Sequence, residues 1–247
     1  MEVIDALIRA APAGKVRQVQ IGLFWTAVVV EEGGAVRCGL AATMRAGNHA
    51  PGREPEVRAA GTLAGLPARE LIELACSDHP TEASVGLAAI NALSQFSMGK
   101  SEDTSGEDFI TRGGTDRNVA VVGHFPFVEG LKERVKALWV LELNPRGDDL
   151  PADAAPDVLP RADVVAITAT TLLNRTFDGL IRLCRPDAQV ILLGPSTPLS
   201  PVLFDFGVTV LCGAVVDKID PVLRGVSQGA NFHQLRPLGA RFATILK

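Results

Sequence analysis

The sequence feature that most constrains the fold is an alternation of apolar strands and amphipathic helices that begins at Asn118. Strands that are apolar on both faces and separated by helices are typical of a parallel sheet with right-handed crossovers. The sequence therefore predicts a Rossmann-like α/β domain over residues 118–247. The expected strands are 119–123, 138–143, 163–168, 189–193 and 208–212, and the expected helices are 127–136, 177–184, 201–206 and 216–226.

The first 98 residues follow a different pattern, in which the strands come before most of the helices. Gly33 and Gly34 separate two apolar runs, which indicates a hairpin. We expect a small α+β domain over 1–98 and a charged, glycine-containing linker at 99–117. The expected elements are a helix at 2–11, strands at 16–23, 24–31 and 35–40, a loop at 45–56, and helices at 67–76 and 81–95; residues 228–247 show no clear pattern.

Composition narrows the classes of partner. The 247 residues are 47% hydrophobic and 21% charged, which is ample for buried cores. A net charge of −4 without a stripe of Lys and Arg argues against a nucleic-acid partner, so we expect a small-molecule ligand. No apolar run reaches the roughly 18 residues of a membrane span, and no secretion signal is visible. We expect a cytoplasmic protein whose four cysteines are reduced. Formation of a homo-oligomer is a possibility that the sequence leaves open.

Small polar residues follow two of the expected parallel strands, where open α/β sheets bind their ligands. Thr168, Thr170, Asn174 and Thr176 follow the strand at 163–168, and more donors gather there than capping of the next helix requires. Gly194 and Ser196 repeat the pattern after the strand at 189–193. Turn formation is an equal alternative for this second pair.

The first strand of this domain ends at Gly123, His124 and Phe125, in the position of a dinucleotide fingerprint but without G-x-G-x-x-G spacing. A tight turn is the alternative role for Gly123. Glu142 ends the next strand about 20 residues later, the placement from which an acidic residue binds ribose hydroxyls. A solvated carboxylate, or a partner for a nearby arginine, is the alternative for Glu142.

In the first domain, Asn91 interrupts an alanine-rich helix and needs a polar partner if it is buried. The Asn91 side chain faces either a loop of its own domain or the ligand. Thr26 lies on the central strand of the first domain, where we expect a core or interface residue. The four histidines have no partner at metal-ligand spacing, so no structural zinc site is visible. His124 is the one histidine at the end of an expected parallel strand.

These residues lie in segments that resemble the bacterial and archaeal family named putative heavy-metal chelation. The matching segments are 21–28, 86–92, 123–127, 163–176 and 193–198. The resemblance implies a domain like the enolase N-terminal domain before a Rossmann-like domain. It also implies a site in the cleft between them. The implied positions are Asn91, Gly123, Phe125, Thr168, Thr170, Asn174, Gly194 and Ser196. Ala169 stands where the family often has glycine.

The sequence thus supports a protein that binds, and in one reading processes, a small polar metabolite or metal-chelating compound in the interdomain cleft. The alternative is a nucleotide- or S-adenosylmethionine-dependent enzyme, indicated by Glu142. A non-catalytic metallochaperone or sensor is a third reading. A metal ion and a nucleotide-type ligand are the candidate cofactors, and whether the protein is an enzyme stays open.

Overall fold

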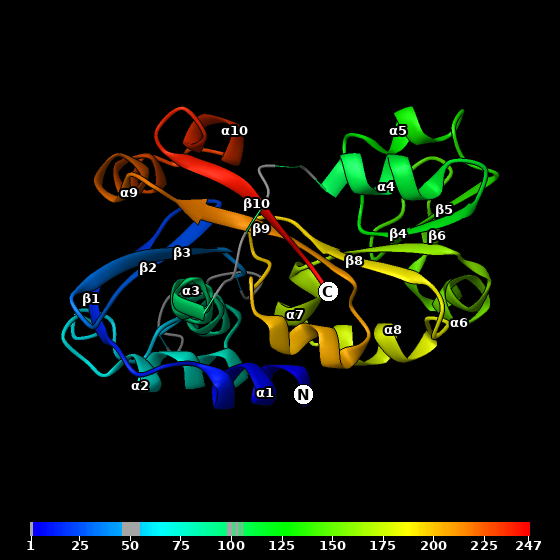
Figure 1. Cartoon of the computed structure of the whole chain (residues 1–247). Helices are drawn as coiled ribbons and strands as arrows, with labels where there is room; N and C mark the ends of the chain where they lie inside the picture. Colours follow the sequence, from blue (N-terminus) through cyan, green and yellow to red (C-terminus); the bar gives the residue numbers. More distant parts are fainter. Residues whose placement is uncertain (1, 46–54, 98–100, 102–103, 105) are drawn as a thin grey trace.

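A computed structural model describes residues 2–45, 55–97, 101, 104 and 106–247. The chain is built around two sheets (Figure 1): a three-stranded antiparallel sheet and a seven-stranded, mostly parallel sheet. This is the mixed α/β class that the sequence predicts. Among the described residues, no helix has both the length and the apolar character needed to cross a membrane.

The antiparallel sheet has the order β1-β2-β3, and the turn at Gly33 and Gly34 joins β2 to β3 as expected for the hairpin. Both glycines have positive φ, which favours glycine in a tight turn. The elements of this part are α1 (Glu2–Ala10), β1 (Lys15–Ile21), β2 (Trp25–Glu32), β3 (Ala35–Ala42), α2 (Ala68–Ile72), the 3-10 helix η1 (Glu73–Cys76) and α3 (Pro80–Ser97).

The larger sheet has the order β10-β9-β8-β7-β4-β5-β6, and only β10 is antiparallel to its neighbour. Its strands are β4 (Asn118–Val122), β5 (Ala137–Glu142), β6 (Leu150–Pro151), β7 (Val164–Thr168), β8 (Gln189–Leu193), β9 (Val210–Val216) and β10 (Ala240–Leu246). The chain moves outward through β4, β5 and β6 and then crosses back to β7. The gap between the carboxyl ends of β4 and β7 is therefore the topological switch point, where such sheets bind ligands.

Helices cover both faces of this sheet (Figure 1). They are α4 (Gly106–Gly114), α5 (Val128–Leu131), α6 (Ala155–Val158), α7 (Thr170–Leu173), α8 (Phe177–Leu183), α9 (Ile219–Ser227) and α10 (Phe232–Leu235), with 3-10 helices η2 (Ala152–Ala154), η3 (Leu159–Arg161) and η4 (Pro201–Phe206). The helix expected at 127–136 is thus only one turn long.

Other elements also differ from the sequence-based expectation, among them β6, α6 and α7, which were not expected. Helix α4 lies inside the expected linker, and its Ile110 is fully buried against the sheet. Strand β10 and helix α10 lie in the C-terminal region for which no pattern was visible. Most of the expected loop at 45–56 and the first part of the expected linker fall outside the described residues, so the domain boundary stays a prediction.

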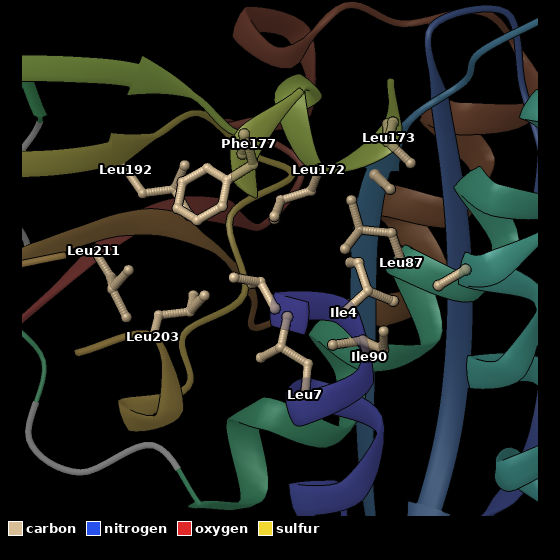
Figure 2. Close-up of a cluster of buried hydrophobic side chains, with 14 of the residues drawn as sticks. Ile4, Leu7, Leu87, Ile90, Leu172, Leu173, Phe177, Leu192, Leu203 and Leu211 are labelled. Carbon is tan, nitrogen blue, oxygen red and sulfur yellow. The ribbon is translucent and has the colours of Figure 1, made fainter. Parts of the chain in front are cut away.

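The two sheets share one core. Figure 2 shows Ile4 and Leu7 of α1 beside Leu87 and Ile90 of α3, close to side chains of the larger sheet and its helices, among them Phe177. All of these residues belong to one cluster of buried side chains. The four cysteines are free, as the sequence predicts.

Candidate functional site

A cavity of about 590 Å³ lies at the carboxyl ends of β4, β5 and β7. We call it the main cavity because of this position, although another cavity, beside Ile21 and Thr43, is larger at about 720 Å³. The volume of the main cavity is within the range typical of small-molecule sites. Its position is the switch point of the larger sheet, as the strand order predicts. The lining residues are Val122, Gly123, His124, Phe125, Leu141, Glu142, Leu143, Ala152, Thr168, Thr170, Thr171, Asn174, Arg175, Thr176, Gly179, Leu180 and Leu183.

Gly123 forms the turn that opens the cavity after β4. Its φ is +100°, and a Cβ added there would lie 3.0 Å from Thr168 Cγ2. Its N–H donates to the Leu141 carbonyl oxygen at 2.9 Å, which ties the turn to β5. Glycine is therefore required here for the close approach of β4 to the end of β7.

Glu142 ends β5 with its carboxylate already oriented. Oε2 accepts the backbone N–H of His124 at 3.0 Å, and Oε1 accepts the backbone N–H of Leu143 at 3.1 Å. Each carboxylate oxygen has a second lone pair, so both can accept another hydrogen bond. A fixed carboxylate of this kind can bind two neighbouring hydroxyl groups of a ligand.

His124 lies beside Glu142, and its imidazole ring contacts the Asp149 carboxylate. The distance from Nδ1 to Asp149 Oδ2 is 3.0 Å, and the Asp149 side chain is only 6% exposed. Asp149 Oδ2 also accepts the backbone N–H of Arg146 at 3.1 Å. The carboxylate is thus fixed and determines the orientation of the imidazole.

A pair of threonine hydroxyls follows β7. Thr168 Oγ1 and Thr170 Oγ1 are 3.0 Å apart, and whichever hydroxyl accepts this bond keeps its own hydrogen for another acceptor. Thr171 is different because its hydroxyl donates to the Thr168 carbonyl oxygen at 2.6 Å within the turn. Thr168 and Thr170 therefore offer one hydroxyl hydrogen to the cavity, while Thr171 stabilises the turn.

Asn174, Arg175 and Thr176 form the rim before α8. Asn174 Oδ1 accepts the backbone N–H of Thr176 at 3.2 Å and its hydroxyl at 2.7 Å, a local turn that leads into the helix. The Arg175 guanidinium donates to Asp78 Oδ1 at 2.6 Å and to the Ser77 carbonyl oxygen at 2.6 Å. Arg175 thus ties the rim of the cavity to the segment that precedes α3.

The structure does not bring four of the candidate residues to the cavity: Thr26, Asn91, Gly194 and Ser196. Asn91 is 4% exposed, and its Nδ2 donates to the Leu40 carbonyl oxygen at 2.7 Å and to the Ser196 carbonyl oxygen at 2.9 Å. Ser196 Oγ accepts the backbone N–H of Ala42 at 2.9 Å. These contacts join the two sheets.

Thr26 and Gly194 have local roles. The Thr26 hydroxyl is buried and lies 3.0 Å from that of Thr43. Gly194 has a φ of +111°, which glycine adopts readily in the turn after β8. Among the residues that the structure describes, those that line the cavity consequently lie between Val122 and Leu183, and none of them belongs to the antiparallel sheet.

A resident metal ion does not fit the described residues. Within 2–45, 55–97, 101, 104 and 106–247, no three His, Cys, Asp or Glu side chains gather closely enough to hold one. His49 lies outside these residues. Besides the Arg175 guanidinium, Glu142 and the His124–Asp149 pair are titratable groups of the described part that hydrogen bonds orient at the cavity.

Sequence reasoning missed Asp149, Arg175 and Gly179. Asp149 and Arg175 act through partners that are distant in the sequence, so no local spacing identifies them. Gly179 lines the cavity from α8, and a Cβ added there would meet no atom within 4 Å. A glycine inside an amphipathic helix was the available signal, because glycine costs helix stability unless space or function requires it.

The fold and the cavity define a mixed α/β protein with a ligand-sized cavity at the carboxyl edge of a mostly parallel sheet. The chain belongs to the family described as putative heavy-metal chelation: the DUF364 model of that description matches residues 108–244, and the DUF4213 model matches residues 4–94. The resemblance inferred from the sequence is confirmed.

Similar proteins agree with this assignment. An uncharacterised protein of Methanocaldococcus jannaschii is 29% identical over 216 residues, which cover 85% of this chain and 82% of that protein. A DUF364 protein of unknown function from Desulfitobacterium hafniense has a crystal structure with a TM-score of 0.83 and 30% identity, covering 100% of this chain and 98% of the other. A second DUF364 protein of unknown function, from Pyrococcus horikoshii, has a crystal structure with a TM-score of 0.82 and 23% identity, which covers 99% of this chain and 98% of the other.

Proposed function

We propose that this protein binds a small polar metabolite in the cavity at the carboxyl ends of β4, β5 and β7. The observation that carries the proposal is the Glu142 carboxylate, which two backbone N–H groups orient at the edge of a cavity of about 590 Å³. The Thr168–Thr170 pair supplies a hydroxyl donor near it. A few fixed polar groups within a largely apolar wall are characteristic of small-molecule sites.

The apolar part of the wall indicates the shape of the ligand. Phe125, Leu143, Leu180 and Leu183 line the cavity, and Leu143 is exposed. We expect the polar end of the ligand at Glu142 and its apolar part against these side chains. Burial of apolar area would contribute about 25 cal/mol per Å² to binding.

A nucleoside-type ligand is the second candidate, favoured by the place of Glu142 in the sheet. Glu142 ends β5, the strand beside β4, and in dinucleotide-binding sheets an acidic residue at this place binds the ribose hydroxyls. In this reading the protein is a nucleotide- or S-adenosylmethionine-dependent enzyme. The turn at Gly123 lacks the second and third glycines of the usual pyrophosphate loop, so a nucleoside fits it better than a dinucleotide.

The test is calorimetric titration of the protein with adenosine, ATP, NAD, NADP and S-adenosylmethionine, together with native mass spectrometry of freshly purified protein to detect a retained metabolite. We expect Glu142→Gln to weaken binding of any hydroxyl-bearing ligand about tenfold or more, because a hydrogen bond to a charged group contributes roughly 1.5–3 kcal/mol. Glu133→Gln, on an exposed position outside the cavity, is the matched control. Equal affinity in Glu142→Gln and wild type would remove Glu142 from the site.

A further inference from the structure

The Glu142 carboxylate lines the main cavity and has no cationic partner among the described residues. Its two hydrogen bonds come from the backbone N–H groups of His124 and Leu143, which are neutral donors. An ionised carboxylate only accepts hydrogen bonds, and each oxygen keeps a lone pair for a further donor. The negative charge of Glu142 is therefore available to a positively charged group of a ligand.

The cation at the rim of the cavity is already paired. Among the described residues that line the main cavity, Arg175 is the one lysine or arginine. Its guanidinium donates to Asp78 Oδ1 and to the Ser77 carbonyl oxygen at 2.6 Å each, and neither of these residues lines the cavity. An anionic ligand would thus meet the like charge of Glu142, which repels it, and mostly neutral donors.

His124 offers a further acceptor beside Glu142. The distance from its Nδ1 to Asp149 Oδ2 is 3.0 Å, and because an ionised carboxylate only accepts, Nδ1 of the neutral ring carries the hydrogen. The lone pair of Nε2 is then free, and the His124 side chain is 45% exposed. The two Glu142 oxygens and Nε2 together match the three hydrogens of a primary ammonium group.

The remaining wall suits an apolar or aromatic body. The Phe125 ring stacks on that of Phe127 with 5.1 Å between the ring centroids, which fixes its position in the wall. Leu143 and Leu180 also line the cavity, and Leu143 is 62% exposed. A ligand that covers these side chains gains affinity from the apolar area that it buries.

We propose that the main cavity binds a small molecule in which a primary ammonium group is attached to an apolar or aromatic body, and that it discriminates against carboxylates and phosphates of similar shape. The ammonium group donates to the Glu142 carboxylate and to His124 Nε2. Hydrogen bonds between charged groups are roughly twice as strong as neutral ones. This inference rests on the proposed function, because the amine is the small polar molecule that the cavity binds.

The experiment compares three indole compounds that differ only at the end of a two-carbon side chain. Tryptamine carries an ammonium group, tryptophol a hydroxyl group and indolepropionate a carboxylate. Each is titrated into the whole chain at neutral pH by calorimetry, with saturation-transfer NMR to detect weak binding. We expect one tryptamine per chain and an affinity for tryptophol that is at least tenfold lower, because its hydroxyl is a neutral donor. Indolepropionate should not bind.

Two pairs of variants assign the ammonium site to its residues. Glu142→Gln should bring the ratio of tryptamine affinity to tryptophol affinity close to one, which a merely structural role of Glu142 would not do. Glu133→Gln, exposed and outside the cavity, is the matched control and should keep the wild-type ratio. His124→Phe should weaken tryptamine binding about threefold to tenfold through loss of one hydrogen bond, whereas His233→Phe, exposed on α10, should not.

Binding of indolepropionate as tight as that of tryptamine, or an unchanged affinity ratio in Glu142→Gln, would overturn the inference. Unchanged tryptamine binding in His124→Phe would remove His124 from the ammonium site. If none of the three indole compounds binds while another Glu142-dependent ligand does, the amine inference alone is wrong. If neither the nucleotide titrations nor native mass spectrometry reveals a Glu142-dependent ligand, the proposed function is wrong as well.

Discussion

Gly123 forms the turn at which the main cavity opens after β4. Its φ of +100° and the 3.0 Å from its added Cβ to Thr168 Cγ2 both disfavour a larger side chain. We expect Gly123→Ala to lower the free energy of unfolding by about 1–3 kcal/mol, the usual cost of a strained backbone conformation. Urea denaturation measures this change. Gly130→Ala is the control, because a Cβ there meets nothing within 4 Å, and it should be neutral or stabilising.

Glu82 makes the stability of the chain depend on pH. Its side chain is 2% exposed, and the hydrogen bond from the Arg58 guanidinium is the main cause that lowers its pKa from 4.5 to about 2. A depressed pKa stabilises the folded state above the unfolded pKa, and this contribution is lost as the pH falls through about 2. The shift corresponds to about 3 kcal/mol at neutral pH.

We therefore expect Glu82→Gln to be less stable than wild type at pH 7, with the difference shrinking steadily between pH 5 and pH 2. Denaturation curves across this range measure it. Glu73→Gln is the control, because Glu73 forms an exposed pair with Arg69, for which about 0–1 kcal/mol is usual. A difference between Glu82→Gln and wild type that does not change with pH would contradict this account.

At the residue scale, the local sequence pattern predicts the residues that line the main cavity better than it predicts the contacts that join the two sheets. Gly123, Glu142 and Thr168 follow strand ends, so topology alone brings them together at one edge of the sheet. Asn91 is different, because its partners are carbonyl oxygens of Leu40 and Ser196, which are distant in the sequence. Neither partner can be inferred from the residue types near Asn91.

At the scale of elements, the packing of α3 on β3 depends on Gly39. A Cβ at this position would lie 2.1 Å from the Ala88 carbonyl oxygen and 2.2 Å from the Ala92 nitrogen, so α3 would have to move. Because both contacts are backbone atoms, we expect Gly39→Ala to cost about 3 kcal/mol, the upper part of the range for overpacking. The free energy of unfolding in urea tests this, and a loss below that of Gly123→Ala would contradict it.

The elements that the sequence predicted are those with strong periodicity. The strands β4, β7 and β8 and the helix α3 are apolar and mostly buried, so the spacing of their apolar residues is clear in the sequence. Helix α4 was missed because it is charged and only Ile110, Gly106 and Gly114 are buried. Strand β10 was missed because it alternates only in part and is stabilised by its pairing with β9.

At the scale of the whole molecule, the antiparallel sheet has both faces covered. Val28 and Val30 face the core that contains α3, whereas Ala27, Val29 and Cys38 face residues of α9 and α10. Figure 1 shows these two helices above the small sheet and α3 below it. The C-terminal region thus completes the packing of the N-terminal one.

A fragment of residues 1–98 would expose the face that α9 and α10 cover. We expect this fragment alone to lack a cooperative unfolding transition, measured by circular dichroism on heating. Co-expression with a fragment of residues 99–247 should restore the transition, because the missing apolar surface is then supplied in trans. A cooperative transition in the isolated fragment would show that the first sheet folds without its C-terminal cover.

The central claim is that the main cavity binds a small molecule. The most direct test is to fill this cavity with a side chain. Gly179 lines it and has open space around an added Cβ, so Gly179→Leu should fold and occupy the ligand volume. Gly130→Leu is the matched control, with equal space but outside the cavity. Native mass spectrometry of the three proteins, freshly purified and after equilibration with adenosine, ATP, NAD, NADP and S-adenosylmethionine, measures the bound ligand. We predict a one-to-one complex in wild type and Gly130→Leu that is lost in Gly179→Leu. Equal binding in all three proteins, or no bound molecule in any, would contradict the account.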